Sequence, residues 1–114
     1  MLIEIIPNQG ASSDLTEAIM NKKKPRAKDK SSLKEGFSIE YMGATSQHGL
    51  SSGVLVEILE FTIQASASIA SGILSNYLYE KLKNRAQKVW INSKEVPIDK
   101  DQIQKVFDEE RGEK

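Results

Sequence analysis

The chain has no cysteine, only one histidine and only three prolines among its 114 residues. The lack of cysteine excludes disulfides, thiol catalysis and thiolate metal sites, and it suits a reducing compartment. Sixteen basic and sixteen acidic side chains cancel, so the chain as a whole has no preference for polyanions. Hydrophobic residues make up 39%, as in ordinary globular proteins, which predicts a single domain over residues 1–114. Residues 1–6 lack the basic start and long apolar run of a secretory signal, so we expect a cytoplasmic protein.

Short apolar runs bounded by turn residues predict strands at both ends of the chain. Residues 2–6 end at Pro7 and predict a first strand, and the alternation over residues 37–42 predicts a second. Residues 88–91 and 95–98 flank a turn-rich junction and predict a carboxy-terminal hairpin.

Capping patterns predict two short helices. Asp14 and Glu17 have capping-box spacing before a helix that reaches about residue 21, and Asp99 and Gln102 repeat this spacing before a final helix. Residues 22–36 carry seven basic side chains and one large apolar one, which predicts a flexible basic loop.

The region from 54 to 84 predicts one long apolar helix. Its polar members fall near one line at helical spacing: Glu57, Glu60, Gln64, Ser68, Ser71 and Ser75. The β-branched residues Val54, Val56 and Ile58 also fit a buried strand, so residues 54–60 remain open between helix and strand. The expected fold is α+β, in which a small sheet of two amino-terminal strands and a carboxy-terminal hairpin packs with this long helix and two short helices.

Such a helix needs cover on most of its sides. We therefore expect self-association or a partner protein on its small-residue face, through Ala65, Ile69, Ala70, Gly72, Ile73 and Tyr77. The alternative is a membrane-associated protein that inserts residues 61–78 into the bilayer. Gln64, Asn76 and several serines make that insertion costly.

The basic run is a candidate for polyanion contact through Lys22, Lys23, Lys24 and Arg26, because clustered cations gain affinity by releasing counterions. A nucleic-acid-binding protein is thus a further alternative. The run contains no aromatic residue for base stacking, so a solvated loop is the favoured interpretation.

No pattern in the sequence predicts catalysis or a cofactor. His48 has Ser46, Ser51 and Ser52 nearby, but neighbours in sequence establish neither an oriented base nor an oxyanion site. Glu57 and Glu60 share the polar stripe of the expected helix, but two carboxylates alone are weak metal ligands. Trp90 is either a partner anchor or a core residue. We expect no catalytic, cofactor or metal site.

The last sixty residues resemble a known family. The run EILEFTIQASASIASGILSNYLYEKLKNR, then the strands KVWIN and KEVPI and the helix DKDQIQKVFDEE, are similar to the effector-associated constant component proteins of bacterial conflict systems. The resemblance covers about residues 54–110, and this pattern contains no catalytic residues. It implies a bacterial adaptor or accessory component that acts through protein–protein contact, which agrees with the non-catalytic interaction module expected from the residues.

Overall fold

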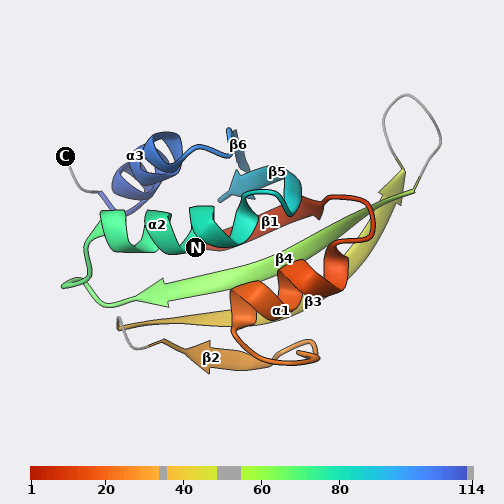
Figure 1. Cartoon of the computed structure of the whole chain (residues 1–114). Coiled ribbons are helices and arrows are strands. Elements are labelled where there is room, and N and C mark those ends of the chain that lie inside the picture. Colours follow the sequence, from red (N-terminus) through yellow and green to blue (C-terminus); the bar gives the residue numbers. More distant parts are fainter. Residues whose placement is uncertain (34–35, 49–54, 113–114) are drawn as a thin grey trace.

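Six antiparallel strands form one sheet, and three helices pack on it in the computed structural model (Figure 1). The structure describes residues 1–33, 36–48 and 55–112. In chain order the elements are β1 (Leu2–Pro7), α1 (Ser12–Met20), β2 (Lys30–Ser32), β3 (Phe37–His48), β4 (Leu55–Ala65), α2 (Ser71–Leu82), β5 (Ala86–Ile91), β6 (Lys94–Val96) and α3 (Lys100–Glu110). The strand order β2-β3-β4-β1-β5-β6 puts β4 and β1 at the centre of the sheet.

The buried side chains of the strands all point to the side of the sheet that the helices cover. Ile3 of β1 lies opposite Phe61 of β4 and Ile91 of β5, and Ile5 lies opposite Leu59, all of them buried. Because side chains alternate along a strand, one register gives the sheet one apolar face. Helix side chains complete this core: Leu15, Ile19, Met20, Leu74, Leu78, Leu82, Ile103, Val106 and Phe107.

The expected long helix over residues 54–84 is wrong. Residues 55–65 form β4, and the helix α2 begins only at Ser71. Leu59, Phe61 and Ile63 are buried at a spacing of two, so the apolar run serves one face of a central strand. This strand pairs with β3 on one side and with β1 on the other, so its backbone groups are bonded along both edges.

The expected fold class is therefore wrong in its main element, and the sheet is larger than predicted. The predicted strands near residues 2–6, 37–42, 88–91 and 95–98 correspond to β1, β3, β5 and β6, to which β2 and β4 are added. The start of the resembling pattern, expected as a helix, is likewise strand in its first part.

The two predicted capping boxes have different outcomes. Asp99 caps α3, because its side chain accepts a hydrogen bond from the backbone N–H of Asp101 at 2.8 Å. At α1 the N-cap is Ala11, which provides no side-chain cap, and Asp14 lies inside the first turn.

The predicted membrane segment does not form one helix either. Residues 61–78 are divided between β4, a connection and α2, which has twelve residues. Within the part of the chain that the structure describes, no helix is both long and apolar enough to cross a bilayer.

Two polar contacts fix α1 on the remaining structure. The hydroxyl of Tyr77 in α2 donates to the carbonyl oxygen of Ile19 at 2.6 Å. The hydroxyl of Ser31 in β2 donates to the carbonyl oxygen of Met20 at 2.6 Å. These are carbonyls of the last turn of α1, which have no partner inside the helix. The end of α1 is therefore held by both a helix and a strand.

Candidate interaction surface

The residues predicted as an interface are divided between β4, the connection that follows it and α2. Ala65 ends β4, Ile69 is buried in the connection that follows, and Ala70 is exposed just before α2. The other three lie in α2, where Ile73 is 44% exposed, while Tyr77 packs against Phe37 with ring centroids 5.2 Å apart. The predicted surface depended on one long helix. The segment instead forms a strand, a connection and a short helix, so the residues do not line up along one helix face.

The two carboxylates predicted to share a polar stripe lie on opposite faces of β4. Glu57 and Glu60 are three residues apart, which brings residues together on a helix but separates them on a strand. No group of three possible metal ligands occurs among the described residues. Ser46 and His48 belong to β3, but the side chain of His48, like Ser51 and Ser52, lies outside the described residues.

The basic loop is tied to its surroundings by its backbone. The N–H of Lys28 donates to the carbonyl of Tyr41 at 2.6 Å, and the N–H of Tyr41 donates to the carbonyl of Asp29 at 2.9 Å. The N–H of Lys24 donates to a carboxylate oxygen of Glu17 at 3.0 Å. These bonds hold residues 24–29 against α1 and β3. The predicted contact with polyanions stays a prediction.

Asp29 organises the turn of this loop. Its carboxylate accepts a hydrogen bond from the backbone N–H of Arg26 at 2.7 Å and forms an ion pair with Lys22 at 3.0 Å. The Arg26 backbone bond, followed by the Lys22 ammonium, holds the pKa of Asp29 below its ordinary value. Nearby, burial and then the charge of Glu57 raise the pKa of Tyr41.

Two shallow hollows lie beside α1, and Ser12 at the start of this helix lines both of them. One of about 420 Å³ is lined by Ser12, Thr16, Lys24 and Arg26, among others. Another of about 490 Å³ opens where β1 leaves β4, since their pairing ends at Ile5 and Leu59. Neither contains a pair of groups with the geometry of a nucleophile and its base.

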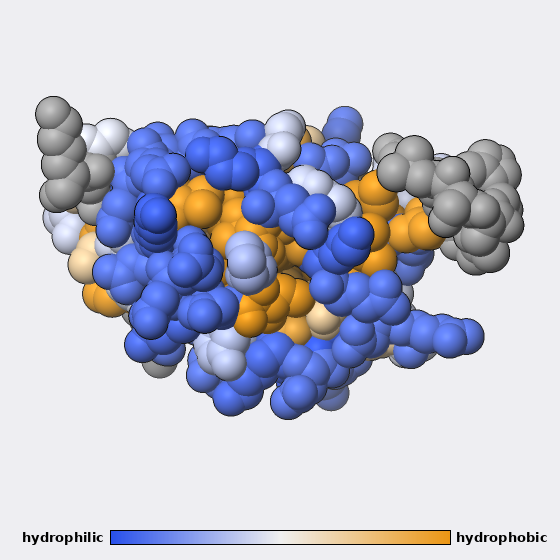
Figure 2. All heavy atoms as spheres, turned by 90° about the horizontal axis from the view of Figure 1, so that it is seen from above, coloured by the Kyte–Doolittle hydropathy of each residue, from blue (hydrophilic) through white to orange (hydrophobic). Residues whose placement is uncertain are grey.

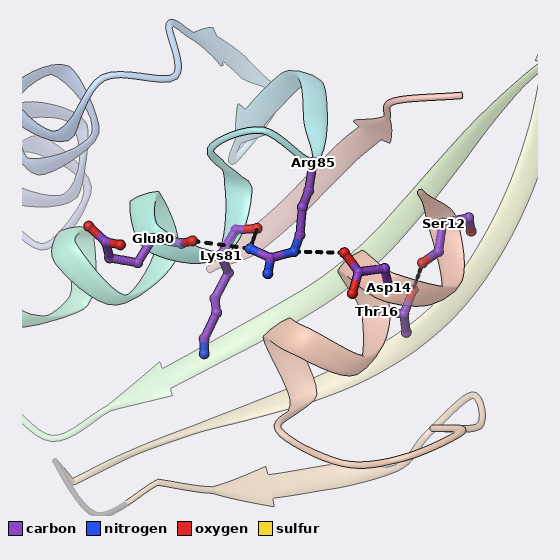
Figure 3. Close-up of polar contacts among 6 residues, drawn as sticks. All are labelled: Ser12, Asp14, Thr16, Glu80, Lys81 and Arg85. Carbon is purple, nitrogen blue, oxygen red and sulfur yellow. Dashed lines mark hydrogen bonds and ion pairs between the residues drawn. The ribbon is translucent and has the colours of Figure 1, made fainter. Parts of the chain in front are cut away.

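Arg85 joins the end of α2 to the start of α1 (Figure 3). Its Nε donates to Asp14 Oδ2 at 2.9 Å, and its Nη1 donates to the carbonyls of Glu80 and Lys81 at 3.4 Å each. The guanidinium thus covers carbonyl groups of the last turn of α2. This polar cluster holds two helices together.

The face of the sheet opposite the helices is the uncovered face, defined by Leu2, Glu4, Ile6, Lys30, Ser32, Ser38, Glu40, Thr45, Val56, Ile58, Glu60, Thr62, Gln64, Lys88, Trp90 and Glu95. Every one of these side chains is partly or fully exposed. Apolar groups on it therefore meet solvent in the described molecule. Figure 2 shows the molecule from above, where apolar residues lie within a frame of polar ones.

One row across the centre of the uncovered face combines charge with an aromatic ring. Glu60 of β4 lies opposite Glu4 of β1, Glu4 lies opposite Trp90 of β5, and Trp90 lies opposite Glu95 of β6. A hollow of about 210 Å³ beside the ring is lined by Glu4, Ile58, Trp90 and Ser93. The only tryptophan of the chain thus lies between two carboxylates and next to an aliphatic side chain.

The carboxylates of this row have no positive partner among the described residues. The ion pairs of that part of the chain involve Asp14, Asp29, Glu40, Glu80 and Glu109. Glu4 and Glu60 repel each other as direct cross-strand neighbours, which disfavours folding. The sequence pattern was not used to single out Glu4. A charged residue between Ile3 and Ile5 in an apolar strand nevertheless indicates a side chain on the exposed face of that strand.

Comparison with models of known protein families, with curated proteins and with solved structures finds no match for this chain.

Proposed function

We propose that this chain is a non-catalytic protein–protein interaction module that binds through the uncovered face of its sheet. The observation that carries the proposal is Trp90, a partly exposed tryptophan of β5 on a face that no described helix covers. Tryptophan is among the residues that contribute most to protein interfaces, because one ring buries a large area at a low cost in conformational entropy.

The surroundings of Trp90 suit a protein partner better than a small molecule. Leu2, Ile6 and Ile58 provide apolar contact near the ring, and Glu4 and Glu60 lie among them as charged groups that a partner of opposite charge can pair. The adjoining hollow of about 210 Å³ is smaller than the usual pocket of a small ligand, which starts at about 300 Å³.

An adaptor role is also what the resemblance to effector-associated constant component proteins implies. The proposal does not depend on that resemblance, since it rests on the face of the sheet. Cytoplasmic location and the absence of catalytic activity are parts of the same proposal.

Site-specific photo-crosslinking in living cells tests the proposal. A photoreactive phenylalanine analogue replaces Trp90 in one variant and Lys105, an exposed residue of α3, in a control variant. We expect a crosslinked protein, either another chain or a second copy, from position 90 and none from position 105. No crosslink from position 90, or equal crosslinks from both positions, would overturn the proposal.

A further inference from the structure

The charges on the uncovered face restrict which partner can cover it. In a symmetrical dimer whose axis passed through the row of Glu4 and Glu60, these residues of one copy would approach the same residues of the other. Like charges brought together in an interface disfavour association. The row therefore selects a positively charged occupant.

We infer that the occupant is the basic loop of a second copy of this chain, so that copies associate head to tail. This inference rests on the proposed function and adds the identity of the partner. The chain contains both complementary surfaces: the row of Glu4, Glu60 and Glu95 around an exposed tryptophan, and a loop of cations. Lys88 and Lys30 also lie on the uncovered face but outside this row.

The cations of the loop are free to meet such a face. Lys23, Lys24, Arg26 and Lys28 are exposed, and none of them forms an ion pair with another described residue. Their backbone is fixed by the bonds to Glu17, Tyr41 and Asp29 described above. A charged loop that is already ordered loses less conformational entropy on binding than a mobile one.

The loop cannot easily neutralise the row of its own chain. It is bonded to Tyr41, whose side chain lies on the helix side of the sheet, at the β2–β3 edge. The row lies on the opposite side, over β4, β1, β5 and β6. Contact between the two surfaces is therefore intermolecular.

The side chains of the row are suited to binding an arginine side chain of another molecule. Trp90 lies between Glu4 and Glu95 in the register, so a guanidinium stacked on the indole has a carboxylate on either side. Arginine over tryptophan is a favourable cation–π pair, and arginine binds carboxylates through two parallel hydrogen bonds. Arg26 is the only arginine of the basic loop, and Lys23 and Lys24 are further cations close to it in the sequence.

A contact between two different surfaces forms rings or open chains of copies. Exposed ion pairs contribute little each, so the association is weak and depends on salt. Because Trp90 is the only tryptophan, its fluorescence reports directly on the face that binds.

Sedimentation velocity and Trp90 fluorescence over a concentration series test the inference with the full chain. At about 0.01 M salt the average mass is expected to rise with concentration and the emission to shift to the blue. At about 1 M salt, where the Debye length is about 3 Å, the association constant is expected to fall at least about tenfold.

Charge reversal identifies the two surfaces. A face variant, Glu4→Lys with Glu60→Lys, and a loop variant, Lys23→Glu with Arg26→Glu, are each expected to be monomeric. An equimolar mixture is expected to associate again, because the loop of each variant is then complementary to the face of the other. Lys100→Glu with Lys105→Glu, on exposed positions of α3, is the matched control and retains the association of the wild type.

The outcomes separate this inference from the proposed function. A monomeric wild type at all concentrations, or a mixture that fails to associate although circular dichroism shows both variants folded, overturns the head-to-tail contact. If position 90 still crosslinks another protein, the interaction module stands and only its occupant is wrong. If position 90 crosslinks nothing, both proposals fail.

Discussion

Glu4 and Glu60 lie directly opposite each other on the two central strands, with no positive charge paired to either among the described residues. Directly opposite side chains of an antiparallel pair have Cβ atoms about 4.5–5.5 Å apart, so two carboxylates there oppose folding. A position that disfavours folding is retained where binding uses it, which is why this pair supports an interaction surface rather than a structural one.

Neutralising one carboxylate of this pair should stabilise the chain. We expect Glu60→Gln to raise the free energy of unfolding by about 0.2–1 kcal/mol, measured by urea denaturation, because the cross-strand repulsion is removed. Glu57→Gln on the same strand, where Glu57 lies opposite the uncharged Ser46, serves as the control and should change little. A fall in stability for Glu60→Gln would mean that a positive group satisfies this carboxylate in solution.

The hydrogen bonds of the Arg85 guanidinium to the carbonyls of α2 should stabilise the fold in addition to its ion pair with Asp14 (Figure 3). Arg85→Ala removes the bonds to Glu80 and Lys81 as well as to Asp14, so we expect a loss of about 0.5–1.5 kcal/mol in unfolding free energy. Asp14→Asn removes only an exposed ion pair and should cost at most about 0.5 kcal/mol. Equal losses for the two variants would show that the ion pair, and not the end of α2, is what Arg85 stabilises.

The local features of the sequence predicted the ends of the chain well. Residues 2–6 and 88–91 form strands because short apolar runs bounded by Pro7 and by Asn92-Ser93 leave few other conformations. The cap at Asp99 was also correct, since a side chain that bonds its own next turn needs no distant partner.

The central region was mispredicted because polar residues from both faces of β4 fall at helical spacing. Glu57 lies on the helix side of the sheet and Glu60 and Gln64 lie on the uncovered face, yet their separations of three and four residues also match one face of a helix. The pairing of β4 with β3 and with β1, which is distant in sequence, decides for a strand. The row around Trp90 was likewise beyond local patterns, because it combines residues of four strands.

Gly72 should tolerate a side chain, in contrast to the expectation of a helix face buried against a neighbour. A Cβ at this position would meet only the side chain of Gln104, at 3.7 Å, which is an ordinary contact. We expect Gly72→Ala to raise the free energy of unfolding by about 0.4–1 kcal/mol, and with it the melting temperature, because alanine reduces the conformational entropy of the unfolded chain.

Gly43→Ala is the matched control for this substitution. Gly43 has φ +117° at the bulge where β3 shifts its register against β4, a conformation that alanine rarely adopts. It should therefore lower the melting temperature while Gly72→Ala raises it. A loss of stability for Gly72→Ala as well would indicate that another molecule packs against α2.

Asp29 should make the stability of the basic loop depend on acid pH. The Arg26 N–H and the Lys22 ammonium hold its pKa below the ordinary value, so the folded chain binds this proton less tightly than the unfolded chain. The ionised carboxylate consequently stabilises the fold above the ordinary aspartate range, near pH 4, and this contribution disappears as the pH falls through the lower folded pKa. Asp29→Asn should therefore be less stable than the wild type near pH 7, and the difference should shrink as the pH falls below about 4, as followed by urea denaturation at a series of pH values. A difference that stays constant with pH would mean that the hydrogen bond from Arg26, which asparagine can still accept, outweighs the charge.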